Sequence, residues 1–175
     1  MPKKSSILKF EIISTIFIMI VGTLLHFTFR WSNNNPLVGT FSAVNESTWE
    51  HLKLLFFPML ISTIIGFSYK GKVIPNYLCA KVLGIILAMS FVVIFFYTYV
   101  GIIGTNFAIV DIGSFFIAVG LGQYVAYQKM QSTSSCSNVI PTIILLVLCS
   151  CFLIFTFFPL HIALFEDPII GSFGI

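Results

Sequence analysis

The segment Asn45–Lys53, NESTWEHLK, gathers the side chains of this 175-residue chain that are best suited to chemistry. It contains the carboxylates of Glu46 and Glu50, the imidazole of His51 and the ammonium of Lys53. Groups of these types transfer protons, bind divalent cations or pair with one another. We therefore take Glu46, Glu50 and His51 as candidate catalytic residues.

The same segment carries the signal for the start of a helix. Ser47 is followed three residues later by Glu50, which is the spacing of a capping box. On a helix that includes them, Glu46 and Glu50 lie four residues apart on one face, so they would share a proton, pair with a nearby cation or hold a metal. The alternative is a capped and charged helix end whose Trp49 is only an interfacial anchor.

The composition excludes an ordinary soluble domain. The chain is 58% hydrophobic and 9% charged, contains 20 Phe, and has a mean hydropathy of +1.03. About 20 apolar residues are needed for a helix to span a bilayer. We predict an all-α polytopic membrane helix bundle, in one domain over residues 1–175, with five transmembrane helices at residues 8–29, 49–69, 77–99, 107–127 and 139–158.

The positive charges predict the orientation, because Lys and Arg near the ends of spans are retained on the cytoplasmic side. With the N-terminus inside, only Arg30 and Lys53 fall outside. The cations on the inner side are Lys3, Lys4, Lys9, Lys70, Lys72, Lys81 and Lys129. The C-terminus is then outside, with an outer loop at residues 30–48 and an apolar tail at residues 159–175 that we expect to cover the outer mouth as a lid. The net charge of +3 then reflects topology, and we expect no nucleic-acid partner.

In this topology the ionisable groups collect at the outer end. Buried ionisable residues in membrane spans are costly and usually face the bundle interior or a wet cavity. The outer groups are His26, His51, His161, Glu46, Glu50, Asp111, Glu166 and Asp167. Asp111 is therefore the fourth candidate catalytic residue. The candidate metal ligands are His26, Glu50 and His51, and the candidate substrate-binding residues are Arg30, Trp49, Lys53, Tyr97 and His161.

The fourth predicted span carries small residues at every fourth position. Such a stripe lets another backbone approach closely, either within the chain or in a homodimer with a second copy. Asp111 lies one turn before the stripe and close to the same face, so we expect it to come within hydrogen-bond or water-bridged reach of the second span near Glu50 or His51. The stripe is formed by Ser114, Ala118, Gly122 and Ala126.

The positions of the four cysteines predict neither a disulfide nor a metal site. Cys79 and Cys136 fall on the predicted cytoplasmic side, where thiols are kept reduced. Cys149 and Cys151 are two residues apart on a predicted helix and so point in nearly opposite directions. We expect neither a disulfide nor a metal site among them.

These observations favour a membrane-embedded enzyme with a polar pocket that opens to the outer leaflet. Its substrate would be a membrane lipid or an isoprenoid, because the pocket is flanked by bilayer and by many Phe residues. The chemistry would be metal-free acid/base catalysis or would use a divalent metal such as zinc, which mixed His and carboxylate sets suit. No HExxH pattern is present to decide between the two.

Two other functions remain open. A transporter or solute-binding subunit needs polar groups at successive depths, and the inner half offers only Glu11, Lys81 and Gln123. A structural or partner-binding protein would use the outer cluster as a salt-bridge network that joins loops to helices.

Three segments resemble a family of small bacterial integral membrane proteins that carry a domain of unknown function. They are RWSNNNPLVGTFSAVNESTWEHLKLLFFPM, FYTYVGIIGTNF followed by VDI, and the ending FFPLHIALFEDPIIGSFGI. The resemblance runs from the first span to the C-terminus. It implies a compact multi-pass protein of the bacterial cytoplasmic membrane and no assigned activity.

Overall fold

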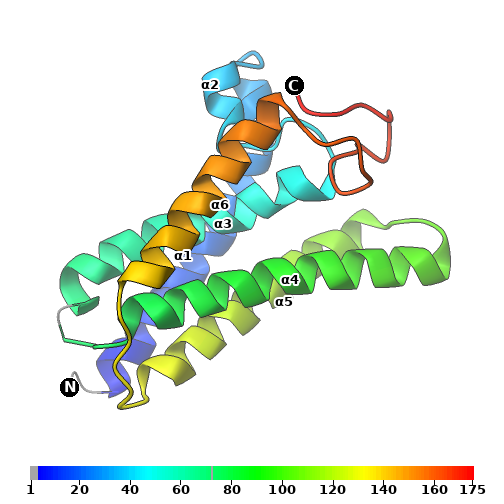
Figure 1. Cartoon of the computed structure of the whole chain (residues 1–175). Helices are drawn as coiled ribbons and strands as arrows, with labels where there is room; N and C mark the ends of the chain where they lie inside the picture. Colours follow the sequence, from blue (N-terminus) through cyan, green and yellow to red (C-terminus); the bar gives the residue numbers. More distant parts are fainter. Residues whose placement is uncertain (1–3, 72) are drawn as a thin grey trace.

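Helices make up the regular structure of the chain (Figure 1). The computed structural model describes residues 4–71 and 73–175, so Lys3 and Lys72 of the predicted inner cations lie outside the described residues. Among the described residues the one β-type pairing is an isolated bridge between Glu166 and Phe173. The elements in chain order are α1 (Lys4–Trp31), α2 (Pro36–Gly39), α3 (Thr48–Gly66), a π-helical turn η1 (Phe67–Gly71), α4 (Tyr77–Ile103), α5 (Ala108–Met130) and α6 (Val139–Phe157).

Five of these helices are long and apolar enough to cross a membrane: α1, α3 with η1, α4, α5 and α6. The prediction of an all-helical chain with five such helices is confirmed. The helices alternate in direction, so the N-terminus and the α3–α4 and α5–α6 connections lie at one end of the bundle. The short helix α2, the tail and the C-terminus lie at the other end, which we call the loop-rich end (Figure 1).

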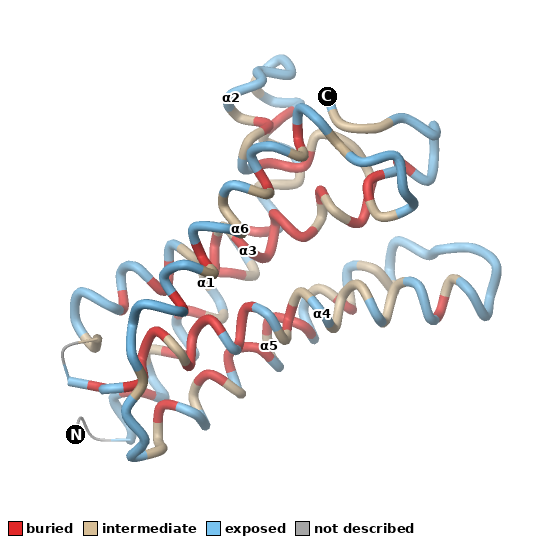
Figure 2. The backbone as a smooth tube through the Cα atoms, in the orientation of Figure 1, coloured by how far each residue is buried: buried red, intermediate tan, exposed pale blue. Residues whose placement is uncertain are grey.

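Helix α3 is the central element of the bundle. In its span 56% of the residues are buried, against 22 to 33% in the other four. The buried side chains concentrate where the helices cross (Figure 2). The core there includes Ile18, Leu55, Phe56, Met59, Ile85, Val119 and Phe152. Because α3 begins within the NESTWEHLK segment, the most enclosed helix of the protein also carries its ionisable cluster.

Helices α4 and α5 approach so closely that Gly84 and Gly122 have no room for a side chain at their crossing. A Cβ atom on Gly122 would lie 2.6 Å from the carbonyl oxygen of Gly84, and a Cβ on Gly84 would collide with the backbone of Gly122. Ala118 and Ala126 are fully buried on the same stripe. The predicted small-residue face of α5 therefore packs against α4 of its own chain. A homodimer remains a prediction, and it would need another surface.

We predict that Gly122→Ala lowers the thermal stability of the purified protein. The added methyl group would have to push two backbones apart, and overpacking of this kind costs about 1 to 3 kcal/mol. Gly113→Ala on the same helix is the matched control, because a Cβ there meets nothing within 4 Å. That change should leave the melting temperature in detergent unchanged or slightly raise it. Equal melting temperatures for both variants would contradict the close crossing.

The structure contains a disulfide between Cys79, in the first turn of α4, and Cys136, in the loop between α5 and α6, with Cα atoms 6.5 Å apart. The expectation that these cysteines stay unlinked is wrong. The loop folds back over the start of α4. Beside it, the side-chain amide of Asn76 donates a hydrogen bond to the carbonyl of Lys129, near the end of α5, at 2.7 Å. A separation of 57 residues gives no sign of this contact. The cysteines that remain free are Cys149 and Cys151.

A buried polar network joins three helices near the end that holds the N-terminus. The Lys81 ammonium on α4 donates to Glu11 Oε2 of α1 at 2.7 Å and to Gln123 Oε1 of α5 at 3.2 Å. All three residues are buried. The two charged members of this network are therefore paired with each other.

Candidate functional site

The helix α3 begins one residue after its cap, as the capping box predicts. Ser47 has extended backbone angles, and its hydroxyl accepts a hydrogen bond from the Glu50 amide at 3.4 Å. The Asn45 side chain in turn accepts the Ser47 amide at 2.9 Å. Glu46 therefore lies before the helix and Glu50 within it. The expectation that Glu46 and Glu50 lie side by side on one helical face is wrong, because the chain turns between them.

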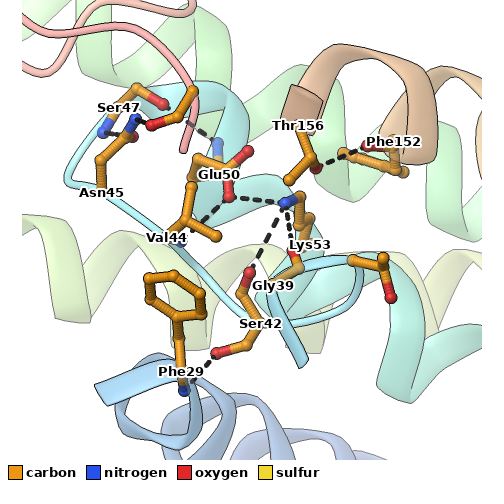
Figure 3. A network of polar contacts seen from close by, with 12 residues as sticks. Phe29, Gly39, Ser42, Val44, Asn45, Ser47, Glu50, Lys53, Phe152 and Thr156 are labelled. Atoms are coloured by element: carbon orange, nitrogen blue, oxygen red, sulfur yellow. Dashed lines mark hydrogen bonds and ion pairs between the residues drawn. The ribbon is translucent and has the colours of Figure 1, made fainter. Parts of the chain in front are cut away.

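Glu50 and Lys53 form an ion pair inside the protein (Figure 3). The Lys53 ammonium donates to Glu50 Oε2 at 2.6 Å and to the Gly39 carbonyl at 2.8 Å. The same carboxylate oxygen accepts the Val44 amide at 3.0 Å. The side chains of Glu50 and Lys53 are only 2% and 0% exposed. This pair fastens the loop between α1 and α3 to the start of α3.

We predict that Lys53→Met strongly destabilises the protein, because it leaves the Glu50 carboxylate buried without its cation. Removing one partner of a buried ion pair costs about 3 to 5 kcal/mol. The double variant Glu50→Gln, Lys53→Met should recover much of that loss, since neither charge then remains. Thermal unfolding of the single and double variants measures this coupling. Melting temperatures near that of the wild type in both single variants would show that the pair does not hold the loop.

Glu46 occupies a different environment, between two histidines. Its Oε2 lies 3.5 Å from His51 Nε2, and its Oε1 lies 4.0 Å from His26 Nε2. The two imidazole rings are adjacent, with centroids 5.3 Å apart. Arg30 reaches the same carboxylate, with its Nη2 3.6 Å from Oε1. We call His26, Glu46 and His51 the outer triad. It differs from the predicted metal set in having Glu46 where Glu50 was expected, because Glu50 is held by Lys53.

The hydrogen bonding of His51 determines which of its ring nitrogens carries a proton in the neutral form. Its Nδ1 lies 2.9 Å from the Ser47 carbonyl oxygen, which accepts hydrogen bonds only. We infer that Nδ1 carries the proton and that Nε2 has a free lone pair. This lone pair faces the Glu46 carboxylate, so two acceptors lie opposite each other. Such an arrangement is stable only with a proton or a cation between them.

The outer triad lines a cavity of about 380 Å³ between α1, α3, α4 and α5. This volume is within the usual range for small-molecule sites. The apolar part of the wall includes Gly22, Phe27, Leu54, Phe96, Ile112 and Phe115. The polar residues that line it are Thr23, His26, Glu46, Thr48, His51, Asn106, Asp111 and Ser114. The cavity thus combines an apolar wall with a few convergent ionisable groups.

Asp111 lines this cavity but is held by its own helix hairpin. Its carboxylate accepts hydrogen bonds from the Tyr99 hydroxyl of α4 and from Asn106 Nδ2, the latter at 3.1 Å. Among the residues that the structure describes, no hydrogen bond joins Asp111 to Glu50 or His51. Tyr99 and Asn106 engage the carboxylate instead, and its reach to Glu50 or His51 through a bridging water stays a prediction. Asp111 and His51 instead share the cavity wall.

The other predicted substrate-binding residues lie outside the cavity wall. Arg30 is largely exposed and contacts Glu46. Three further residues contact the tail or lie in it, which the sequence could not show because the position of the tail was unknown. The ring of Trp49 packs on that of Phe165, with centroids 4.9 Å apart. The Tyr97 hydroxyl donates a hydrogen bond to the Ala163 carbonyl at 2.9 Å. The ring of His161 packs on that of Phe173, with centroids 4.7 Å apart.

Asp167 in the tail positions the loop that carries Glu46. Its Oδ2 accepts the Glu46 backbone amide at 3.0 Å, while its Oδ1 accepts the amides of Ile169 and Ile170 at 2.8 and 3.3 Å. Pro168 and Ile169 line the cavity. Sequence reasoning did not assign this role to Asp167, although an Asp followed by Pro is a typical turn signal. Asn106 and Tyr99 were missed as partners of Asp111 because a hairpin turn brings them to it.

Comparison with known proteins identifies a family and no activity. The model of the family of unknown function DUF6512 matches residues 1–175, so the chain belongs to this family. No curated protein and no solved structure matches the chain. Any function must therefore be argued from the outer triad and the cavity.

Proposed function

We propose that this chain, a member of a family of unknown function, is a multi-pass enzyme of the bacterial cytoplasmic membrane. In this proposal the cavity takes up the polar end of an amphiphile, such as a lipid or an isoprenoid, and the outer triad does acid/base chemistry on it. The observation that carries the proposal is the cavity of about 380 Å³ whose mostly apolar wall meets His26, Glu46, His51 and Asp111.

The shape of the site favours an amphiphile over a sugar or a peptide. The ionisable groups lie within two turns of helix ends: His26 near the end of α1, His51 in the first turn of α3 and Asp111 in the first turn of α5. Apolar residues such as Leu54 and Phe115 line the wall deeper in the bundle. A ligand with a polar head and an apolar body would match both parts.

The neutral form of His51 is suited to accept a proton. Its Nε2 lone pair borders the cavity and is oriented by the hydrogen bond from Nδ1 to the Ser47 carbonyl. Glu46 would stabilise the imidazolium that forms, as a carboxylate within 3.5 Å of Nε2 does. Asp111, held by Tyr99 and Asn106 on another part of the wall, would then orient or polarise the reacting group.

The inner half of the bundle argues against a transport path for a polar solute. Glu11, Lys81 and Gln123 are engaged in one buried network. The apolar side chains of Ile18, Leu55, Phe56, Met59 and Val119 form the core between that network and the loop-rich end. A path for a polar solute needs polar groups at successive depths, and these core side chains offer none.

A purely structural role fits Glu50 and Lys53 better than the outer triad. The side chains of His26, Glu46 and His51 are 31%, 28% and 34% exposed, and they line a cavity instead of filling the core. Their separations of 3.5 and 4.0 Å are also longer than the 2.6 Å of the buried pair. The triad is thus accessible and loosely paired, as a site that accepts a ligand requires.

We predict that a reporter fused after Ile175 is active outside the cytoplasm. The cation count places the N-terminus and the α5–α6 loop in the cytoplasm, and five spans then place the C-terminus outside. The disulfide points the other way, because Cys79 and Cys136 lie at the end assigned to the cytoplasm and disulfides persist in oxidising compartments. We give more weight to the cations, since seven of the nine in the sequence favour this orientation and the disulfide is a single opposing observation. A C-terminal reporter active only in the cytoplasm would reverse the orientation.

A substitution that fills the cavity should displace the amphiphile. We predict that Ile112→Trp reduces a lipid or isoprenoid that co-purifies with the wild type, because Ile112 lines the cavity. Ile109→Trp is the matched control, on the same helix, 82% exposed and outside the cavity wall. Mass spectrometry of organic extracts from the purified proteins measures the difference. The same extract from both variants and the wild type would remove the ligand-binding part of the proposal.

His51→Asn separates binding from chemistry. The variant should retain the amphiphile, because its volume and some hydrogen bonding are kept, but it should lose proton transfer at Nε2. Its melting temperature should stay close to that of the wild type, since His51 is half-buried and outside the core. A collapse of stability comparable with that of Lys53→Met would show instead that His51 holds the fold.

A further inference from the structure

We infer that the outer triad is a binding site for a divalent transition metal, with zinc as the best match. The inference rests on the proposed function in one respect, since the metal would occupy the polar part of the same cavity. It adds the identity of the cation that the triad holds. The geometry, the hydrogen bonding of His51 and the open side of the site each support it.

The spacing of the donor atoms fits a single ion. Zinc bonds to His nitrogen and carboxylate oxygen are about 2.0 to 2.2 Å long, so tetrahedral ligand atoms lie about 3.3 Å apart. In the structure His51 Nε2 and Glu46 Oε2 are 3.5 Å apart, and His26 Nε2 and Glu46 Oε1 are 4.0 Å apart. One donor atom from each of the three residues lies within 4.8 Å of the others. To bind one ion, the donor atoms would have to move closer together than they lie in this structure.

His51 has the hydrogen bond that a metal-binding histidine requires. Such a histidine donates its other ring N–H to a carbonyl or carboxylate, which fixes the tautomer and aims the free lone pair at the metal. In this protein Nδ1 donates to the Ser47 carbonyl at 2.9 Å, and Nε2 points to the Glu46 carboxylate. His26 lacks this support, because its buried Nδ1 has no hydrogen-bond partner. His51 should therefore contribute more to affinity than His26.

The number of ligands leaves a coordination position free. Two histidines and one carboxylate is the ligand set of several catalytic zinc sites, in which the fourth position holds water or substrate. All three residues line the cavity, so the free position is accessible to a ligand there. A bound zinc would occupy the Nε2 lone pair of His51, so in the metal-loaded protein the base would be the zinc-bound water, whose pKa zinc lowers to about 7, and no longer His51 itself.

Arg30 separates this interpretation from a simple salt bridge. Its guanidinium lies 3.6 Å from Glu46 Oε1 and competes with a metal for the same carboxylate, but its side chain is 77% exposed and free to move away. If Glu46 only forms a salt bridge with Arg30, the wild type binds no metal, and Arg30→Gln, which removes that partner, binds none either. If Glu46 is a metal ligand, the same change removes a competing positive charge and tightens metal binding.

The test measures zinc binding to the full chain in detergent, without any substrate. The protein is stripped with a chelator, dialysed and titrated with zinc alone, and bound zinc is counted by equilibrium dialysis with elemental analysis. We expect one zinc per chain, with affinity at least tenfold lower in Glu46→Gln and His51→Ala, and lower by less in His26→Ala. Arg30→Gln should bind as tightly as the wild type or more tightly.

Two controls make the result specific. His161→Ala removes a histidine that packs on Phe173, away from the triad, and should leave the zinc affinity unchanged. Cobalt bound to the wild type should give the visible absorption of a four-coordinate site. This measurement does not depend on the folding of any variant. Absence of stoichiometric zinc binding by the wild type would overturn the inference. An equal loss in His161→Ala and His51→Ala, or weaker binding in Arg30→Gln, would also overturn it.

This design distinguishes failure of the metal-site inference from failure of the proposed function. Lipid extraction from the chelator-treated wild type tests retention of the amphiphile without metal. Retained amphiphile with no zinc binding would overturn the metal site and leave the proposed function intact. Zinc binding by a chain that retains no amphiphile would support the metal site and contradict the proposed substrate class.

Discussion

The structure depends on the pairing of charges that are removed from water. Among residues 4–71 and 73–175, two ammonium groups are buried, and each lies within 2.7 Å of a carboxylate: Lys53 with Glu50 near the loop-rich end and Lys81 with Glu11 near the other. An unpaired charge at these positions would cost several kcal/mol, so the pairs restrict how the surrounding segments can pack. Lys81 and Glu11 hold α4 against α1, and Lys53 and Glu50 hold the loop after α1 against α3. The outer triad is positioned by this framework and is not part of it.

The two acids of NESTWEHLK differ because the helix begins between them. Glu50, inside α3, turns to the ammonium one helical turn further on and becomes enclosed. Glu46, before the helix, is held by its backbone amide on Asp167, and its carboxylate is left to the histidines and Arg30. The same short segment therefore provides both a structural anchor and the accessible triad.

Local patterns in the sequence predicted the features that depend on interactions between residues close together in the chain. Apolar length predicted the five long helices, the Ser47 and Glu50 spacing predicted the start of α3, and the small residues of α5 predicted a close crossing. The partner of that stripe, the role of Asp167 and the link between Cys79 and Cys136 depend on how distant segments fold back. Periodicity carries no information about such contacts. The choice of Glu50 as a metal ligand failed for a related reason, since a three-residue separation from Lys53 does not reveal that both side chains are enclosed.

The disulfide joins two segments of a chain whose long helices are apolar enough to cross a membrane. In water, closing a loop of this length would remove much of the entropy of an unfolded chain. The connection between α4 and α5 joins these helices at their other ends, so a bond between Cys79 and Cys136 closes the open end of that hairpin. Its effect falls on the segment that follows α5, which it holds against the first turn of α4. The position of α6, which starts three residues after Cys136, is thereby tied covalently to α4 and not only through side-chain packing.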